Sequence, residues 1–192
     1  MLQDPASTLR AISRVSAREV HLIVAAHGGG DEMVEHADKI AALTDAVAVL
    51  TALGAPYALI GGVAVGLHAK LPRATLDTDL AVASAFRGPG LTDAFVAAGF
   101  EARGEHPHSV NFRHVSGEPV QLAFDSAFDG MIGRAEAFDI DGATVRVVTK
   151  DDLVAMKRRA GADPTRRRSK ALRDQADVEL LLGDRPQEDE GW

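Results

Sequence analysis

The sequence predicts a compact α/β (α+β) fold, in which helices flank a mixed β-sheet and a helical segment ends the domain. Hydrophobic residues form 46% of the 192 residues and charged residues 26%, a balance typical of globular proteins. Short apolar runs alternate with helical periodicity over residues 36–98, and two strand-turn-strand patterns occupy residues 110–148. These three observations indicate a sheet whose strands are joined both by helices and by tight turns.

Composition narrows the classes of protein that fit. The chain contains no cysteine, which rules out disulfides and cysteine-ligated metal sites and agrees with a cytoplasmic location. No window reaches the ~18 apolar residues that a membrane span needs, so we expect no membrane partner. The net charge of −7 argues against coating nucleic acid by bulk attraction, although residues 150–173 hold nine basic and three acidic residues.

The chain divides into three segments. Residues 5–24 carry a modest helical pattern, and the glycines at 28–30 interrupt any regular element that follows. We therefore expect residues 1–35 to be a loosely attached helical extension, residues 36–183 to be the main domain, and the polar residues 184–192 to be a disordered tail.

Helices and strands alternate through the first half of the main domain. Apolar residues recur at three- and four-residue steps between residues 35 and 53, which predicts a helix that ends before Gly54 and Pro56. The elements expected next are a strand over 57–60, a brief helix after Gly61 and Gly62, a strand over 76–82 and a helix over 92–98.

The second half begins with two predicted hairpins. Strands over 110–115 and 120–124 flank the turn SGEP, and strands over 135–140 and 144–148 flank Asp141-Gly142. Thr149 then suits the N-cap of a helix, because Asp152 follows three residues later in an approximate capping box. A last helix is expected over residues 169–182.

Two aspartates stand in the strand predicted over residues 76–82. Side chains two apart in a strand point to the same face, so Asp77 and Asp79 are expected side by side. A divalent cation relieves their repulsion, and carboxylates without histidine or cysteine favour Mg²⁺. Two solvated aspartates are the ordinary reading of an arbitrary D-x-D. Here Gly61 and Gly62 favour the metal site, because a glycine turn at a helix N-terminus lets backbone N–H groups approach a phosphate.

A third carboxylate is available near the end of the strand over 120–124. If an adjacent strand brings Asp125 beside the pair, the three acidic groups form a site for Mg²⁺-dependent phosphoryl or nucleotidyl transfer. The alternative role for Asp125 is a cap at the end of its strand, and Asp129 is the fallback candidate.

The stretch YALIGGVAVGLHAKLPRATLDTDLAV resembles the active-site signature of the polymerase-beta-like nucleotidyltransferase superfamily. The form GG…R-x-T-x-D-x-D is closest to the branch of AbiEii/AbiGii-type toxins, in which helices similar to DDLVAMKRRA and RDQADVELLL also follow. The likeness covers about residues 38–183. It implies a minimal nucleotidyltransferase fold, Mg²⁺ as cofactor and an NTP as substrate.

The resemblance also implies roles for particular residues. It assigns the metal and catalytic carboxylates to Asp77, Asp79 and Asp125, and nucleotide contacts to Gly61, Gly62 and Lys157. The FDSAFD sequence around Asp125 departs from the V-D-L-L pattern of the family. Arg73 is a candidate for a phosphate contact, or for pinning its loop by pairing with a carboxylate.

The expected activity is transfer of an NMP from an NTP to an acceptor, with release of pyrophosphate. The acceptor stays open between tRNA, a protein and a small molecule, and the resemblance implies a toxin with an antitoxin partner. One alternative is a D-x-D metal-dependent glycosyltransferase, against which the glycine pair and the small size of the chain count. Another is a catalytically silent member that binds only nucleotide or a partner protein.

Overall fold

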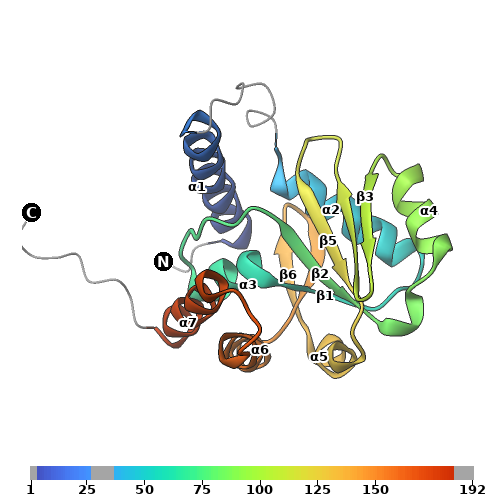
Figure 1. Ribbon diagram of the computed structural model, residues 1–192. Helices are drawn as coiled ribbons and strands as arrows, with labels where there is room; N and C mark the ends of the chain where they lie inside the picture. The colour runs from blue at the N-terminus through green and yellow to red at the C-terminus, as the bar shows by residue number, and fades with distance from the viewer. Residues whose placement is uncertain (1–3, 27–36, 184–192) are drawn as a thin grey trace, which may run out of the picture.

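The computed structural model describes residues 4–26 and 37–183 of the chain. Within these residues one mixed sheet has the strand order β3-β4-β5-β2-β1-β7-β6, with helices packed around it (Figure 1). The strands are β1 Tyr57–Ile60, β2 Thr78–Val82, β3 Glu101–His106, β4 Ser109–Arg113, β5 Pro119–Ala123, β6 Glu136–Ile140 and β7 Ala143–Val147. The predicted α/β fold class is confirmed.

Seven α-helices and two short 3₁₀ turns connect the strands within the described part of the chain. The helices are α1 Pro5–Ala26, α2 Lys39–Ala52, α3 Gly61–Ala69, α4 Pro89–Ala97, α5 Asp129–Arg134, α6 Lys150–Ala162 and α7 Arg168–Leu182, and the turns are η2 Ser84–Phe86 and η3 Ser126–Phe128. None of these helices is both long and apolar enough to cross a membrane. Helices α1, α3, α6 and α7 form one contiguous group, whereas α2 and α4 contact each other (Figure 1).

The central strands hold the core. All four residues of β1 are buried, because β2 pairs with it in antiparallel fashion on one side and β7 lies parallel to it on the other. Strand β2 in turn pairs in parallel with β5. The chain passes from β1 straight into α3 at Gly61, so the helix begins at the edge where β2 also starts.

Both predicted hairpins are confirmed, and β4 pairs with β5 and β6 with β7. Asp141 and Gly142 have positive φ angles of 52° and 83°, the conformation that a two-residue hairpin turn requires. The predicted N-cap is confirmed, since the Asp152 N–H donates to the Thr149 hydroxyl over 3.2 Å. The Asp152 carboxylate accepts a hydrogen bond from the Thr149 hydroxyl over 2.9 Å rather than from its backbone N–H, as a full capping box requires.

The starts of two elements and the presence of one strand differ from the sequence prediction. Strand β2 begins at Thr78 rather than at residue 76, so Asp77 stands in the bend before the strand and Leu76 is exposed. Helix α4 begins at Pro89, which is favoured at the first helical position. Strand β3 was not predicted, because its residues are polar and mostly exposed and show no apolar alternation.

The N-terminal helix packs against the domain. Leu9 and Ile12 of α1 are fully buried, and Gly66 of α3 makes room for Ile12. A Cβ atom on Gly66 would lie 2.6 Å from Cδ1 of Ile12. The described part of the predicted extension is thus packed rather than loosely attached. The predicted boundary at residue 35 and the predicted tail over 184–192 lie outside the described residues.

Candidate active site

The centre of the site is the contact between Asp79 and Gly61. The antiparallel register of β1 and β2 puts Asp79 opposite Ile60, the last residue before the glycine turn. A Cβ atom on Gly61 would overlap Oδ2 of Asp79 and lie 2.8 Å from its Cγ. Gly61 also has a φ of 70°, which side chains rarely adopt. The close approach of this carboxylate to the turn therefore requires glycine.

The loop before β2 lies over the second glycine. A Cβ atom on Gly62 would overlap the Arg73 guanidinium and lie 2.5 Å from Oγ1 of Thr75. Helix α1 holds this loop from the other side, because the Thr75 N–H donates to the Ser16 hydroxyl over 3.1 Å. The loop that carries Asp77 is thus fixed between α3 and α1.

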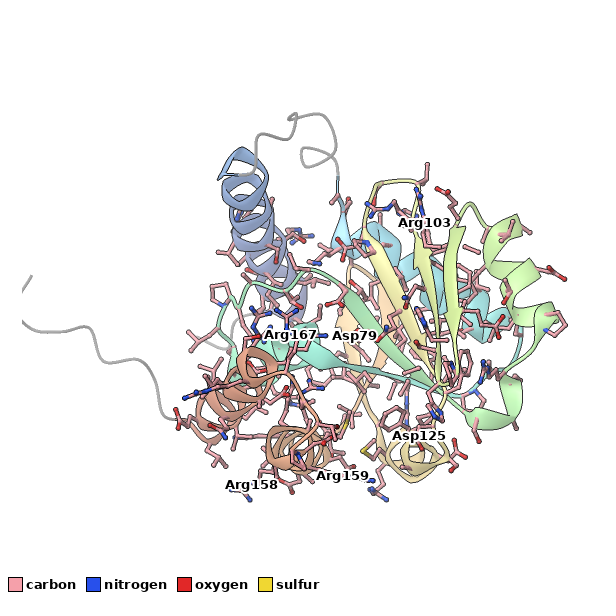
Figure 2. All side chains as sticks on the ribbon, viewed as in Figure 1. Asp79, Arg103, Asp125, Arg158, Arg159 and Arg167 are labelled. Atoms are coloured by element: carbon pink, nitrogen blue, oxygen red, sulfur yellow. The ribbon has the colours of Figure 1, made fainter. Side chains whose placement is uncertain are left out.

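Electrostatics single out Asp79 (labelled in Figure 2). Burial, and after it the negative charge of Asp77, raise its pKa to about 7. The charges of Lys157, Lys39 and Arg73 act in the opposite direction. The charges of one carboxylate and three cationic side chains therefore act on Asp79. As a result, Asp79 binds a proton more tightly than an isolated aspartate does.

This pKa predicts two opposite pH dependences. The native state holds a proton on Asp79 that the unfolded chain releases at its ordinary pKa of 3.8, so the metal-free protein should lose stability as pH rises from about 4 to about 7. Mn²⁺ must displace that proton, so its affinity should rise up to roughly tenfold per pH unit below about pH 7 and then level off. Denaturant unfolding and calorimetric titration measure the two trends, and Asp79→Asn should flatten both. A flat profile in the unsubstituted protein contradicts the prediction.

Buried ion pairs connect the two aspartates of α7 with basic residues on α6, in the loop before β2 and in the loop before α7. Nζ of Lys157 lies 2.9 Å from Oδ1 of Asp174 and 2.8 Å from Oδ2 of Asp177. Arg73 forms a two-point pair with Asp177, and Arg166 pairs with Asp174 over 2.6 Å. Both aspartates are buried, with exposed fractions of 2% and 3%. Of the two roles weighed for Arg73, the structure displays the pairing that pins its loop.

Removing one of these buried carboxylates should destabilise the fold. Asp177→Asn leaves the largely buried Arg73 guanidinium without a charged partner and removes one of the two carboxylates that pair with Lys157, so we expect a loss of about 3 kcal/mol in the free energy of unfolding. Glu105→Gln is the matched control, because Glu105 pairs with Arg87 on the surface and its loss should cost at most about 1 kcal/mol. Urea unfolding of both variants measures the difference. Equal losses would show that the buried pairs are not special.

Asp125 does not join the pair. It follows β5, and its side chain accepts a hydrogen bond from the Ala127 N–H as the N-cap of η3. Figure 2 shows Asp125 beside α5, away from Asp79. The fallback Asp129 accepts hydrogen bonds from the backbone and hydroxyl of Ser84. Among residues 4–17 and 37–183, no three histidine or acidic side chains gather closely enough to hold a metal ion.

The position beside Asp79 on β5 belongs to Gln121. The parallel register pairs Asp79 with Gln121, and the next strand pairs Gln121 with Asn111. The amide Nε2 of Gln121 donates to Oδ1 of Asn111 over 2.9 Å. The alternation of Val120 and Leu122 indicates that Gln121 points to the opposite face of β5, but the sequence carried no signal for the register that brings it to Asp79.

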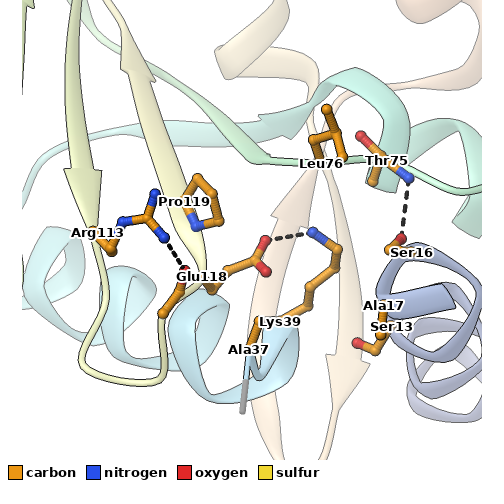
Figure 3. A pocket seen from close by; sticks show the side chains of 11 residues that line it. Ser13, Ser16, Ala17, Ala37, Lys39, Thr75, Leu76, Arg113, Glu118 and Pro119 are labelled. Carbon is orange, nitrogen blue, oxygen red and sulfur yellow. Dashed lines mark hydrogen bonds and ion pairs between the residues drawn. The ribbon is translucent and has the colours of Figure 1, made fainter. Parts of the chain in front are cut away.

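A cavity of about 220 Å³ is lined by Thr75 and Leu76, the two residues that precede Asp77 in the sequence (Figure 3). Its walls come from α1, the start of α2, the loop before β2 and the turn between β4 and β5, and its lining includes Ser13, Lys39, Leu76, Arg113 and Glu118. Lys39 and Glu118 form a buried ion pair over 2.5 Å. The buried Oγ of Ser13 has no hydrogen-bond partner within the described residues. No motif in the sequence indicates this cavity, because its lining residues come from distant parts of the chain. A larger hollow of about 620 Å³ borders Tyr57, at the opposite end of β1 from Gly61.

Comparison with solved structures identifies the fold. The chain is similar to the lincosamide antibiotic adenylyltransferase LnuA, with a TM-score of 0.52, 12% identity, and coverage of 72% of this chain and 93% of that one. It is similar to ANT(2")-Ia in complex with adenylyl-2"-tobramycin, with a TM-score of 0.53, 17% identity, and coverage of 76% and 90%. The chain has a nucleotidyltransferase fold.

A third structure agrees with this fold. An antigenic nucleotidyltransferase-like protein from Paracoccidioides brasiliensis has a TM-score of 0.52 and 20% identity, and the match covers 74% of each chain. No protein-family model matches the sequence, and no curated protein matches it either. In the nucleotidyltransferase fold of this chain, the carboxylate pair and the glycine turn lie at the junction of β1, α3 and β2.

Proposed function

We propose that the protein is a Mg²⁺-dependent nucleotidyltransferase that moves an NMP from an NTP to an acceptor. The observation that carries the proposal is the contact of the Asp79 carboxylate with the Gly61 turn, with Asp77 close enough for its charge to raise the pKa of Asp79. A cation held by these carboxylates would lie next to the N-terminus of α3, where free backbone N–H groups favour a phosphate. An arbitrary pair of solvated aspartates has no such neighbour.

Each residue has a separate task in this proposal. Asp77 and Asp79 would hold Mg²⁺, and the ion would supply electrostatic stabilisation of the charge on the phosphates while the bond from the α-phosphorus to pyrophosphate breaks. The backbone at Gly61 and Gly62 binds the triphosphate. Lys157 adds a positive charge that the buried Asp174 and Asp177 hold in place. The acceptor oxygen forms the new bond to the α-phosphorus, and its proton leaves to solvent.

The cavity lined by Thr75 and Leu76 is the place proposed for the acceptor. Its volume of about 220 Å³ suits a ring-sized group rather than a folded surface, and polar side chains line it together with apolar ones. A small hydroxyl-bearing molecule therefore fits best. One of the similar structures is a lincosamide antibiotic adenylyltransferase with lincomycin bound, and another holds adenylyl-2"-tobramycin.

RNA is the second candidate acceptor. Exposed basic residues support it, namely Arg158 and Arg159 on α6 and Arg167 just before α7 (Figure 2). A protein acceptor stays the third. The resemblance to AbiEii/AbiGii-type toxins supports the remaining part of the proposal, a cytoplasmic toxin whose partner is an antitoxin protein.

The test is a transfer assay with each α-³²P-labelled NTP, Mg²⁺, and either total RNA or a mixture of small hydroxylated compounds that includes lincomycin and tobramycin. Label on a small molecule supports the proposed acceptor, and label on RNA or on a protein supports nucleotidyl transfer to the other acceptors. Label nowhere, with nucleotide still bound, favours the catalytically silent alternative. Hydrolysis of a UDP-sugar in a parallel reaction favours the glycosyltransferase. Asp77→Asn serves as the inactive control.

A further inference from the structure

Three polar side chains form a row across neighbouring strands of the sheet. Asp79 on β2 pairs with Gln121 on β5, and Gln121 pairs with Asn111 on β4. Paired residues on adjacent strands point to the same face. The side chain next to Asp79, where a third carboxylate was expected from Asp125, is therefore a neutral amide.

The predicted third carboxylate stands too far along the strand to replace it. Asp125 follows Gln121 by four residues, which corresponds to roughly 13 Å in an extended chain. The strands run parallel, so this displacement takes Asp125 beyond the end of β2 that is opposite to Asp79. Its carboxylate is also engaged in capping η3.

The hydrogen bond to Asn111 orients the Gln121 amide. Because Nε2 donates to Asn111 on β4, the oxygen Oε1 is not used in this hydrogen bond and can accept from or ligate another group. An amide oxygen can ligate a hard cation, but it contributes no charge and accepts no proton near neutral pH. Gln121 can therefore contact an ion at the carboxylate pair without holding another.

The charges around the pair disfavour a second ion. Two carboxylates balance one divalent cation, and the positive charges of Lys157, Lys39 and Arg73 already act on Asp79. The carboxylate nearest to the pair at the start of β5 is Glu118, which is already engaged by Lys39 and by the Thr78 hydroxyl. No cluster of three acidic or histidine side chains is present among residues 4–17 and 37–183, so a second divalent ion would find no free carboxylate on the β5 side. A two-ion site usually places its metals ~3.5–4 Å apart, which demands more negative charge than this face supplies.

We propose that this site holds a single divalent cation on Asp77 and Asp79, and that Gln121 occupies the place at which a carboxylate would bind a second one. The inference rests on the proposed nucleotidyl transfer. Its consequence is that the acceptor oxygen approaches the α-phosphorus beside a neutral amide and is neither bound by a second metal ion nor deprotonated by a side chain of β5.

The experiment counts Mn²⁺ ions on the full chain in the presence of α,β-methylene-ATP. Equilibrium dialysis gives the number of ions, corrected for nucleotide in solution, and electron paramagnetic resonance separates isolated Mn²⁺ from a dipolar-coupled pair. The unsubstituted protein should bind one isolated ion. Gln121→Glu should bind a second, coupled ion. Asn111→Asp is the matched control, because it adds the same charge one strand further away and should still bind one.

The outcomes separate the inference from the function on which it rests. A coupled pair in the unsubstituted protein overturns the inference, even if nucleotidyl transfer is observed. A folded Gln121→Glu or Gln121→Asp variant that binds only one ion also overturns it, because Gln121 is then not at the metal. One ion together with no transfer of label refutes the proposed activity alone. No bound ion refutes both.

Discussion

Replacing Asp79 with asparagine is expected to abolish nucleotidyl transfer while leaving the protein as stable as before or more so. The loss of one of two cation ligands should reduce the rate by at least about a thousandfold, because the metal provides several kcal/mol of charge stabilisation. The ionised carboxylate is disfavoured by burial and by Asp77, so the amide should raise the free energy of unfolding at pH 8 by on the order of 1 kcal/mol. The two measurements are the transfer of α-³²P label and urea unfolding.

Asp125→Asn is the control for this substitution. It removes the same charge, and asparagine can still accept the hydrogen bond from the Ala127 N–H that caps η3. Because Asp125 lies away from the pair, its replacement should leave both the transfer rate and the stability nearly unchanged. A loss of activity as large as that of Asp79→Asn would restore Asp125 as the third catalytic carboxylate.

Gly61→Ala should damage both the site and the fold. The new methyl group would overlap the Asp79 carboxylate, and the φ of 70° adds the strain of a left-handed conformation, about 1–2 kcal/mol. We expect the free energy of unfolding to fall by about 3 kcal/mol in total, and the transfer rate to fall at least a hundredfold since the carboxylate must move. Urea unfolding and the transfer assay measure the two effects.

The chain offers a matched control in Gly54. Its φ of 64° is close to that of Gly61, but nothing lies within 4 Å of the place that a Cβ atom would take. Gly54→Ala should therefore cost only the backbone strain of ~1–2 kcal/mol and leave transfer intact. If both variants lose activity equally, the contact between Asp79 and the turn does not matter for function.

The elements around the site were predictable because local chemistry determines them. An apolar run followed by two glycines indicates a strand that enters a helix, and it predicted the bounds of β1 and α3 to within two residues. Asp141-Gly142 and Thr149 likewise specify a turn and a cap through their own backbone conformations. In each case the decisive residues are neighbours in the sequence.

The partners of the site residues were not predictable because they depend on register and on distant pairs. The register of β5 against β2 puts Gln121, rather than Asp125, beside Asp79. Asp177 meets Arg73 across 104 positions of sequence, and Lys39 meets Glu118 across 79. A single sequence shows which side chains carry charge, but it does not show which of them come together in three dimensions.

The hydrogen bond from Thr75 to Ser16 makes helix α1 a structural support of the candidate site. A shortened protein that starts at residue 37 would lack Ile12, which fills the space above Gly66, and would leave the Thr75 amide without its acceptor. We therefore expect a protein without helix α1 to hold the loop that carries Asp77 in less defined positions.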